Sequence, residues 1–352
     1  MGMKAVLGRG ICSIAAVLTM VQAAPMQEKL YEVPKAMVIY KISGGGALNE
    51  DVNLTLDGNG KLRFKEWGGV ELVERNITER TTGALHYVGH KEICEKRQQS
   101  QILDVDFKNR KIRERPLPKG KEAVNRTAGL VRSGQQMVAN IVCTMWEGKG
   151  VKKCLYKGIP LFTEYSALGL YYREEAVEVA FDINISNEAD CSMPKYPVEK
   201  FALYTTNFKT KSKKTPKIFP ERLREVITVL KGKSIDEESL QERQKRALLN
   251  KLGEPIFEDQ KKLLPKFLQT MKKTRACLVQ AETTDAANSC LNELVKIKSY
   301  FTGNTQNRID DWEEEREKVL DAFDENIISL QSKMKCIRGA KRMDDLSVCM
   351  KQ

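Results

Sequence analysis

Two segments near the C-terminal end of the chain share one arrangement of cysteines. The first reads ACLVQAETTDAANSC (276–290) and the second reads KCIRGAKRMDDLSVC (335–349). In both, an alanine follows the first cysteine by four positions, an aspartate by eight and the second cysteine by thirteen. Such a repeat restricts the fold strongly, because each copy must bring two distant thiols together.

The residues between the cysteines predict a helical corner in each copy. In the first copy a helix passes Cys277, and Thr283-Thr284-Asp285 offers side chains that cap the start of the next helix. Both thiols then lie near the corner, so we predict the bridges Cys277–Cys290 and Cys336–Cys349. Zinc sites and redox dithiols are the alternatives, but both favour much closer cysteine pairs.

The first 23 residues have the features of a signal peptide. Lys4 and Arg9 precede ICSIAAVLTMV, an apolar run that is too short to span a bilayer. We expect cleavage near Ala23 and export across the inner membrane to the periplasm, without a transmembrane anchor. Eight cysteines remain in the mature chain, and an even number in an oxidising compartment predicts disulfides.

Residues 24–200 are expected to form an antiparallel β domain. Apolar and polar residues alternate from Lys35 to Ile185, and Asp57-Gly58-Asn59-Gly60 predicts a hairpin between two short strands. Only residues 121–141 have a helical spacing, which predicts one helix covering the sheet. The expected fold class is therefore α+β.

The segment MWEGKGVKKC predicts a second hairpin, with Gly148-Lys149 as its turn. This turn would place Cys143 opposite Cys154, at a distance that suits a bridge. The pair Cys94–Cys191 would then remain, although the other two pairings of these four cysteines stay open.

Several runs in this half resemble a known family. The runs YKISGGG, LRFKEWGGVELVE, DVDFKNRKI, KKCLYKGIPL and EAVEVAFDINIS look like exported domains of the DUF4412 type, which are similar to the LolA/LolB-like half-barrels. The resemblance covers residues 35–190 and implies an incomplete barrel whose apolar cavity holds a lipid or acyl chain. Carried over to this chain, the candidate lining residues are Met37, Ile39, Leu62, Phe64, Leu161 and Leu168. A filled barrel core is the alternative.

The remainder of the chain is expected to be helical. Residues 201–218 are basic and contain prolines, as is typical of a linker. Residues 219–352 place apolar side chains at spacings of three and four, and residues 309–335 predict one long helix. We therefore expect an all-α domain with the two cysteine-stapled hairpins.

Motifs for catalysis are scarce. The chain has only two histidines, and His86, His90 and Cys94 would lie about 13 Å apart along a strand, too far to share one metal ion. No nucleophile elbow and no phosphate-binding lysine loop occurs. We predict a protein that is not an enzyme and that holds no metal or cofactor.

Glycosylation is a further candidate feature of the exported chain. Four asparagines begin sequons, Asn53, Asn76, Asn125 and Asn184. Asn53, Asn76 and Asn184 also have an acidic residue two positions earlier, as in the extended bacterial sequon, so these three are the candidate sites.

The net charge of +12 is spread thinly along the chain, and export makes nucleic acid an unsuitable partner. We predict an exported binding protein, with an apolar ligand in the half-barrel or an envelope protein as its partner. The alternatives are an envelope structural protein with a filled barrel and, less favoured, a hydrolase that uses carboxylates.

Overall fold

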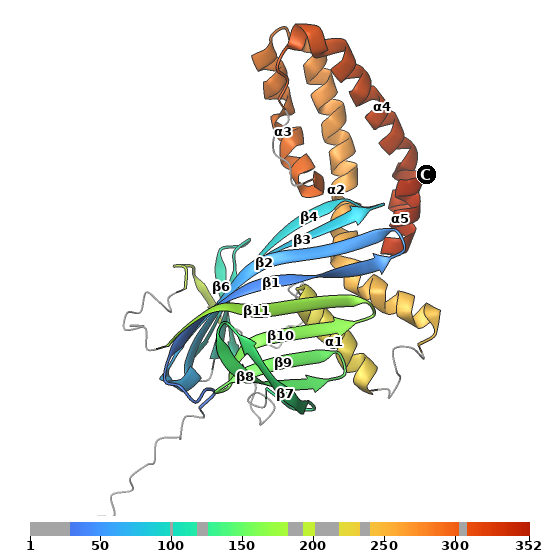
Figure 1. Cartoon of the computed structure of the whole chain (residues 1–352). Helices are drawn as coiled ribbons and strands as arrows, with labels where there is room; N and C mark the ends of the chain where they lie inside the picture. The colour runs from blue at the N-terminus through green and yellow to red at the C-terminus, as the bar shows by residue number, and fades with distance from the viewer. Residues whose placement is uncertain are drawn as a thin grey trace, which may run out of the picture.

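The computed structural model shows an open antiparallel sheet joined to a helical half (Figure 1). It describes residues 29–98, 101–117, 126–181, 193–200, 218–232, 240–302 and 308–352. The expected α+β class, with strands followed by helices that disulfides staple, is confirmed. The signal peptide and most of the basic linker lie outside the described residues.

The sheet contains 12 strands in the order β12-β6-β5-β4-β3-β2-β1-β11-β10-β9-β8-β7. All neighbours are antiparallel except β12 and β6. Because β12 and β7 form the two edges, the sheet does not close into a barrel. The strands are β1 (Ala36–Asn49), β2 (Val52–Lys65), β3 (Val70–Gly83), β4 (Tyr87–Gln98), β5 (Gln101–Asp106), β6 (Lys111–Pro116), β7 (Val131–Val138), β8 (Ile141–Gly148), β9 (Val151–Tyr156), β10 (Ile159–Ala167), β11 (Leu170–Phe181) and β12 (Val198–Lys200).

The hairpin predicted at residues 57–60 is wrong, because β2 runs through them without a turn. Gly60 lies opposite Tyr40, and Gly58 lies opposite Ile42 on one side and Ile77 on the other. A Cβ atom on Gly58 would come within 2.1 Å of the Asn76 carbonyl oxygen. These glycines therefore permit close strand packing instead of reversing the chain.

The helix predicted at residues 121–141 is also wrong in the part that the structure describes. Val131–Val138 form the edge strand β7, which turns into β8 through Ala139 and Asn140. Both turn residues have positive φ, 48° and 62°, as a two-residue hairpin turn of type I′ requires. A helix from the second half, α1 (Phe219–Gly232), packs against β10 instead.

The helical half contains five helices among the described residues. After α1 come α2 (Glu242–Gln280), α3 (Thr284–Thr302), α4 (Trp312–Gly339) and α5 (Met343–Lys351). Of these, α2 is one 39-residue helix that continues through Pro255 and Pro265. In Figure 1, α2 rises from the sheet with α3 and α4 on either side of it.

Both repeated corners form as predicted. Cys277–Cys290 and Cys336–Cys349 are disulfides whose Cα atoms lie 5.7 and 5.6 Å apart. In the first corner the Thr283 hydroxyl accepts a hydrogen bond from the Ala286 amide, as expected for a capping residue. The repeat therefore builds two stapled helical hairpins.

The predicted Cys143–Cys154 disulfide is also present, with Cα atoms 5.4 Å apart. Its geometry differs from the prediction, because Gly148 pairs with Val151 and the turn lies one residue later. Cys154 consequently faces Met145, and the bridge runs diagonally between the strands.

Cys94 is a buried free cysteine, so the structure does not show the predicted Cys94–Cys191 bridge. Cys191 itself lies outside the described residues. Burial raises the pKa of the Cys94 thiol to about 11, and the nearby Glu74 contributes in the same direction. Cys94 is therefore held as an unreactive thiol at neutral pH.

The helices and the sheet share one buried core. Phe219 and Leu223 of α1 belong to the same apolar cluster as Leu54 and Leu170 of the sheet. Arg222 of α1 also enters this junction, where its guanidinium lies 3.8 Å from the Glu79 carboxylate. The linker between the halves is largely undescribed, so the predicted domain boundaries stay a prediction.

Candidate functional site

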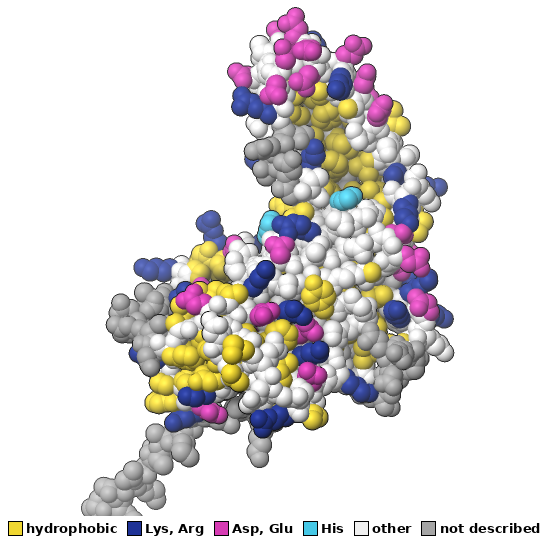
Figure 2. Space-filling view, viewed as in Figure 1, with side chains coloured by type: hydrophobic (Ala, Val, Ile, Leu, Met, Phe, Trp, Pro, Cys, Tyr) yellow, Lys and Arg dark blue, Asp and Glu magenta, His cyan; other side chains and the backbone are white. Residues whose placement is uncertain are grey.

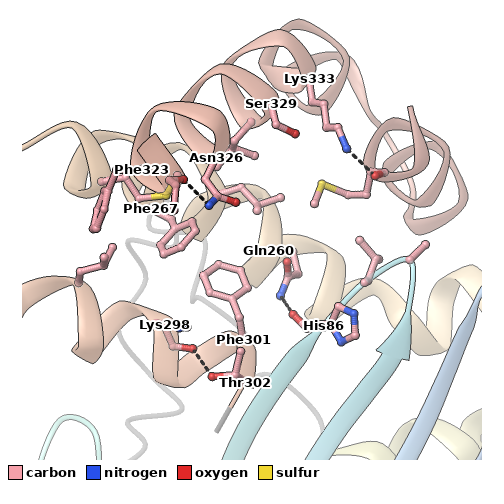
Figure 3. Close-up of a pocket in the computed structure, with 18 of the residues that line it drawn as sticks. His86, Gln260, Phe267, Lys298, Phe301, Thr302, Phe323, Asn326, Ser329 and Lys333 are labelled. Atoms are coloured by element: carbon pink, nitrogen blue, oxygen red, sulfur yellow. Dashed lines mark hydrogen bonds between the residues drawn. The ribbon is translucent and has the colours of Figure 1, made fainter. Parts of the chain in front are cut away.

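An apolar pocket of about 620 Å³ lies in the helical half, above the turn between β3 and β4 (Figure 3). Most of its lining side chains are apolar, and they come from α2, α3, α4, α5 and this turn. They are Ala84, Leu85, Leu264, Phe267, Met271, Leu294, Phe301, Val319, Ala322, Phe323, Leu330 and Met350. Volumes of this size are typical of small-molecule sites.

Helical periodicity explains why these side chains converge. Leu264, Phe267 and Met271 follow each other at three and four residues along α2, so they share one face. Phe301 of α3 meets this face, and its ring centre lies 5.1 Å from that of Phe267. The corner disulfide between α2 and α3 fixes the two helices that carry this aromatic pair.

The sheet supplies the floor of the pocket. Leu85 is fully buried in the β3–β4 turn, and the next residue, His86, is held through its backbone carbonyl. This carbonyl accepts a 2.9 Å hydrogen bond from the Gln260 side chain of α2, which is itself 1% exposed. The pocket therefore depends on the docking of the helices onto the sheet.

The polar residues of the lining lie on α2, α3, α4 and the floor turn, and they are His86, Gln260, Lys298, Thr302, Asn326, Ser329 and Lys333. The lining includes two lysines and no carboxylate. The Lys333 ammonium donates a 2.8 Å hydrogen bond to the Met350 carbonyl and so ties α4 to α5. Figure 2 shows hydrophobic side chains gathered in the hollow of the helical half.

The structure does not place the six predicted half-barrel residues on one face of the sheet. Leu62 and Phe64 lie opposite Val38 and Ala36, whereas Met37 and Ile39 lie opposite Arg63 and Lys61. Because side chains alternate along a strand, Met37 and Ile39 face the other side of the sheet from Leu62 and Phe64.

Of the remaining two predicted residues, Leu161 joins Leu62 and Phe64, whereas Leu168 lies elsewhere. Leu161 is fully buried in the same apolar cluster as Leu62 and Phe64. Leu168 lies in the turn between β10 and β11 with a φ of 56° and belongs to the larger core under the helices. None of the six lines the helical pocket, and Leu62 alone borders a second cavity.

This second cavity, of about 460 Å³, lies between β2–β4, β9–β11 and the start of α1, and its lining is strongly charged. Arg75 and Glu174 face each other there, with the Nε atom 2.5 Å from Oε1 and Nη2 3.2 Å from Oε2. Tyr172 donates a 2.6 Å hydrogen bond to the same carboxylate. Burial opposes ionisation of Glu174, but Arg75 outweighs it and holds the pKa of Glu174 below its usual value.

A second charged group closes another side of this cavity. Arg126 donates to the Tyr31 hydroxyl at 2.8 Å and to the Glu71 carboxylate at 3.2 Å. Burial, followed by the Glu71 charge, raises the pKa of Tyr31 well above its usual value, so the phenol stays protonated. The charge of Arg126 is therefore neutralised by Glu71 within the protein.

Glu95 at the edge of the charged cavity has a strongly altered pKa. Burial and the adjacent Asp104 raise the pKa of Glu95 to about 7, although Arg115 opposes them. Arg115 lies 2.9 Å from Glu95 and 2.6 Å from Asp104, so one guanidinium serves two carboxylates. The raised pKa brings the titration of the Glu95 carboxyl close to neutral pH.

The described residues show neither a cluster of metal-ligand side chains nor a membrane-spanning helix. They contain no group of three or more histidines, cysteines or acids that could hold a metal ion, and none of their helices is long and apolar enough to cross a membrane. Of the predicted glycosylation sites, Asn53 and Asn76 are exposed on β2 and β3, while Asn184 lies outside the described ranges.

Comparisons with known proteins leave the family open. No family model matches the sequence, and no curated protein matches it. Among solved structures, the chain is similar to an uncharacterized conserved protein from Thermus thermophilus with 8% sequence identity and a TM-score of 0.27. That match covers 47% of this chain and 91% of the other.

The sequence contains part of the signal for the helical pocket. The apolar stripe of α2 indicates a helix face that must be buried. The space that α3 and α4 leave beside this stripe depends on tertiary packing. The spacing of apolar residues in the sequence does not encode that packing.

Proposed function

We propose that this protein binds one apolar ligand in the pocket between α2, α3 and α4. The observation that carries the proposal is a cavity of about 620 Å³ whose walls are mainly leucine, phenylalanine and methionine side chains. Water gains little from contact with such walls, so an apolar ligand that replaces it is favoured by the hydrophobic effect.

The location differs from the one that the family resemblance implies. An acyl chain in the sheet cavity would lie against ion pairs such as Arg75–Glu174 and Arg126–Glu71 and would shield them from water without replacing their solvation. The lining of the helical pocket contains no carboxylate and therefore no such ion pair. We keep the relation to DUF4412-type half-barrels as a proposal for the sheet, supported by its open antiparallel order.

We also propose that the protein acts in an oxidising compartment, the periplasm. Three disulfides support this, because such bonds persist outside the reducing cytosol. The role we assign is that of a non-catalytic carrier or sensor of the ligand.

A neutral fluorescent probe such as N-phenyl-1-naphthylamine tests the proposal. Saturable binding of one probe per chain is expected. Ala322 is an exposed residue of α4 that lines the pocket, so Ala322→Trp should fill the space and abolish binding. Ile328→Trp is the matched control, since Ile328 is 68% exposed on α4 and outside the lining.

Two results would contradict the proposal. One is the absence of saturable binding to the unmodified protein. The other is unchanged binding to the Ala322→Trp variant in a protein whose circular dichroism and unfolding midpoint match those of the control.

A further inference from the structure

We infer that the ligand is a single-chain amphiphile with an anionic head group, which Lys333 recognises and to which Lys298 adds positive charge in the lining. This inference rests on the proposed apolar binding function and adds the chemical class of the ligand. It depends on the distribution of charge around the pocket, which the volume alone does not reveal.

The ionisable groups of the pocket are all basic. Its lining contains Lys298, Lys333 and His86 and no aspartate or glutamate. The chain as a whole contains 47 acidic residues against 59 lysines and arginines, so a lining of this size without any acid is a local departure from the composition. An anionic group entering the pocket would meet attraction and no opposing carboxylate.

The geometry of Lys333 leaves it able to bind a ligand. Its ammonium uses one hydrogen bond to hold the Met350 carbonyl, and an ammonium has three donors. The side chain is half-buried, so its charge is screened less than that of a fully exposed lysine. A charge-assisted hydrogen bond to a carboxylate is consequently stronger here than at the open surface.

Polar neighbours accompany each of the two lysines. On α4, Ser329 lies one turn and Asn326 two turns before Lys333, and Thr302 follows Lys298 by one turn on α3. In Figure 3, Ser329 and Lys333 lie on one side of the pocket and Lys298 and Thr302 on the other, with the rings of Phe267 and Phe301 between them. An amphiphile would thus place its chain among the rings and its head group beside Lys333 and Ser329.

The experiment compares three ligands with the same unbranched alkyl chain: the carboxylate, the primary alcohol and the primary amine. Each is titrated at neutral pH, below its critical micelle concentration, by displacement of the neutral probe. We expect the carboxylate to bind about ten-fold more tightly than the alcohol, and the amine to bind most weakly.

Substitution of the lysines supplies the second arm. Lys298→Met with Lys333→Met keeps the apolar stems and should weaken carboxylate binding about ten-fold more than it weakens alcohol binding. Lys296→Met with Lys335→Met is the matched control, because both residues are exposed on the same two helices and lie outside the lining.

The outcomes separate the two claims. If none of the three ligands displaces the probe, or the probe itself fails to bind, the proposed function is wrong. If all three bind equally, or the amine binds most tightly, the apolar function stands and the head-group inference is overturned. Equal effects of the pocket and control lysine pairs would overturn it as well.

Discussion

The helical pocket and the sheet cavity differ in the side chains that form their walls. The helical pocket is lined by apolar side chains on helices that two disulfides join at their corners. The sheet cavity is lined by arginines and glutamates that bind one another across strands. The difference shows which cavity has interactions left to offer a ligand.

In the sheet cavity Arg75, Arg115 and Arg126 are already paired with carboxylates. A polar ligand would have to replace bonds such as Arg75–Glu174, and an apolar ligand would leave them desolvated. The lining of the helical pocket is mainly apolar and contains no carboxylate, so it holds no such ion pair. We therefore expect the sheet cavity to govern stability and the helical pocket to govern binding, and the following predictions test this division from the largest expected effect to the smallest.

Replacing Glu174 with glutamine should destabilise the fold most. The change leaves the Arg75 guanidinium partly buried without its counter-charge, which costs about 4 kcal/mol when a buried pair is broken on one side. Urea unfolding measures the loss, and binding of the neutral probe under native conditions should be unchanged. A variant as stable as the unmodified protein would contradict the importance of this pair.

Removing the C-terminal bridge with Cys336→Ser and Cys349→Ser should lower both the stability of the fold and the affinity for the ligand. The loop-closure estimate gives a loss of about 3 kcal/mol in the free energy of unfolding. Binding should also weaken, because α5 carries Met350 into the pocket. Removing Cys143–Cys154 is the comparison, since that bridge lies in the sheet and its loss should leave probe binding intact.

Phe301→Ala should affect binding more than stability, the opposite of the prediction for Glu174→Gln. Phe301 is only half-buried, so the loss of stability should be about 1 to 2 kcal/mol, below the value for a fully buried phenylalanine. Loss of its ring contact with Phe267 should weaken apolar binding about ten-fold. Isothermal titration with the alkyl alcohol measures the affinity, and unchanged affinity would place the ligand elsewhere.

The smallest effect concerns pH and belongs to the sheet. The folded protein raises the pKa of Glu95 from 4.5 to about 7, so between these values the folded state binds more protons than the unfolded state. Stability should therefore fall as pH rises from about 4.5 to about 7. The side chain is 38% exposed, and solvent screening limits the effect to less than about 1 kcal/mol.

Glu95→Gln should remove this part of the pH dependence. Unfolding midpoints measured across the same pH range would show it, with the unmodified protein as reference. A slope that persists unchanged in the variant would assign the titration to another group.

The sequence predicts those parts of the fold in which neighbouring residues decide the structure. The two helical corners follow from cysteine spacing and capping residues within fifteen positions, and both are present. The Cys143–Cys154 bridge follows from a turn that the sequence pattern places one residue too early. Local sequence signals therefore predict which cysteines are bridged better than they predict the pairing register of the strands.

Predictions that needed distant partners failed. Gly58 and Gly60 resemble turn residues locally, but both lie inside β2, and Gly58 leaves room for the backbone of Asn76 on β3. The alternation that grouped Met37 with Leu62 could not show that the two side chains lie on opposite faces. The helical pocket arises where α2, α3 and α4 meet the β3–β4 turn, which is a property of the tertiary structure alone.

A crystal structure with a fatty acid that carries bromine at the end of its chain tests the central claim most directly, because the anomalous signal of bromine locates the chain. We predict a bromine peak among Phe267, Phe301 and Phe323, with the carboxylate near Lys333. A peak beside Tyr40 and Tyr172 in the sheet cavity, or no ordered ligand at saturating concentration, would contradict the account.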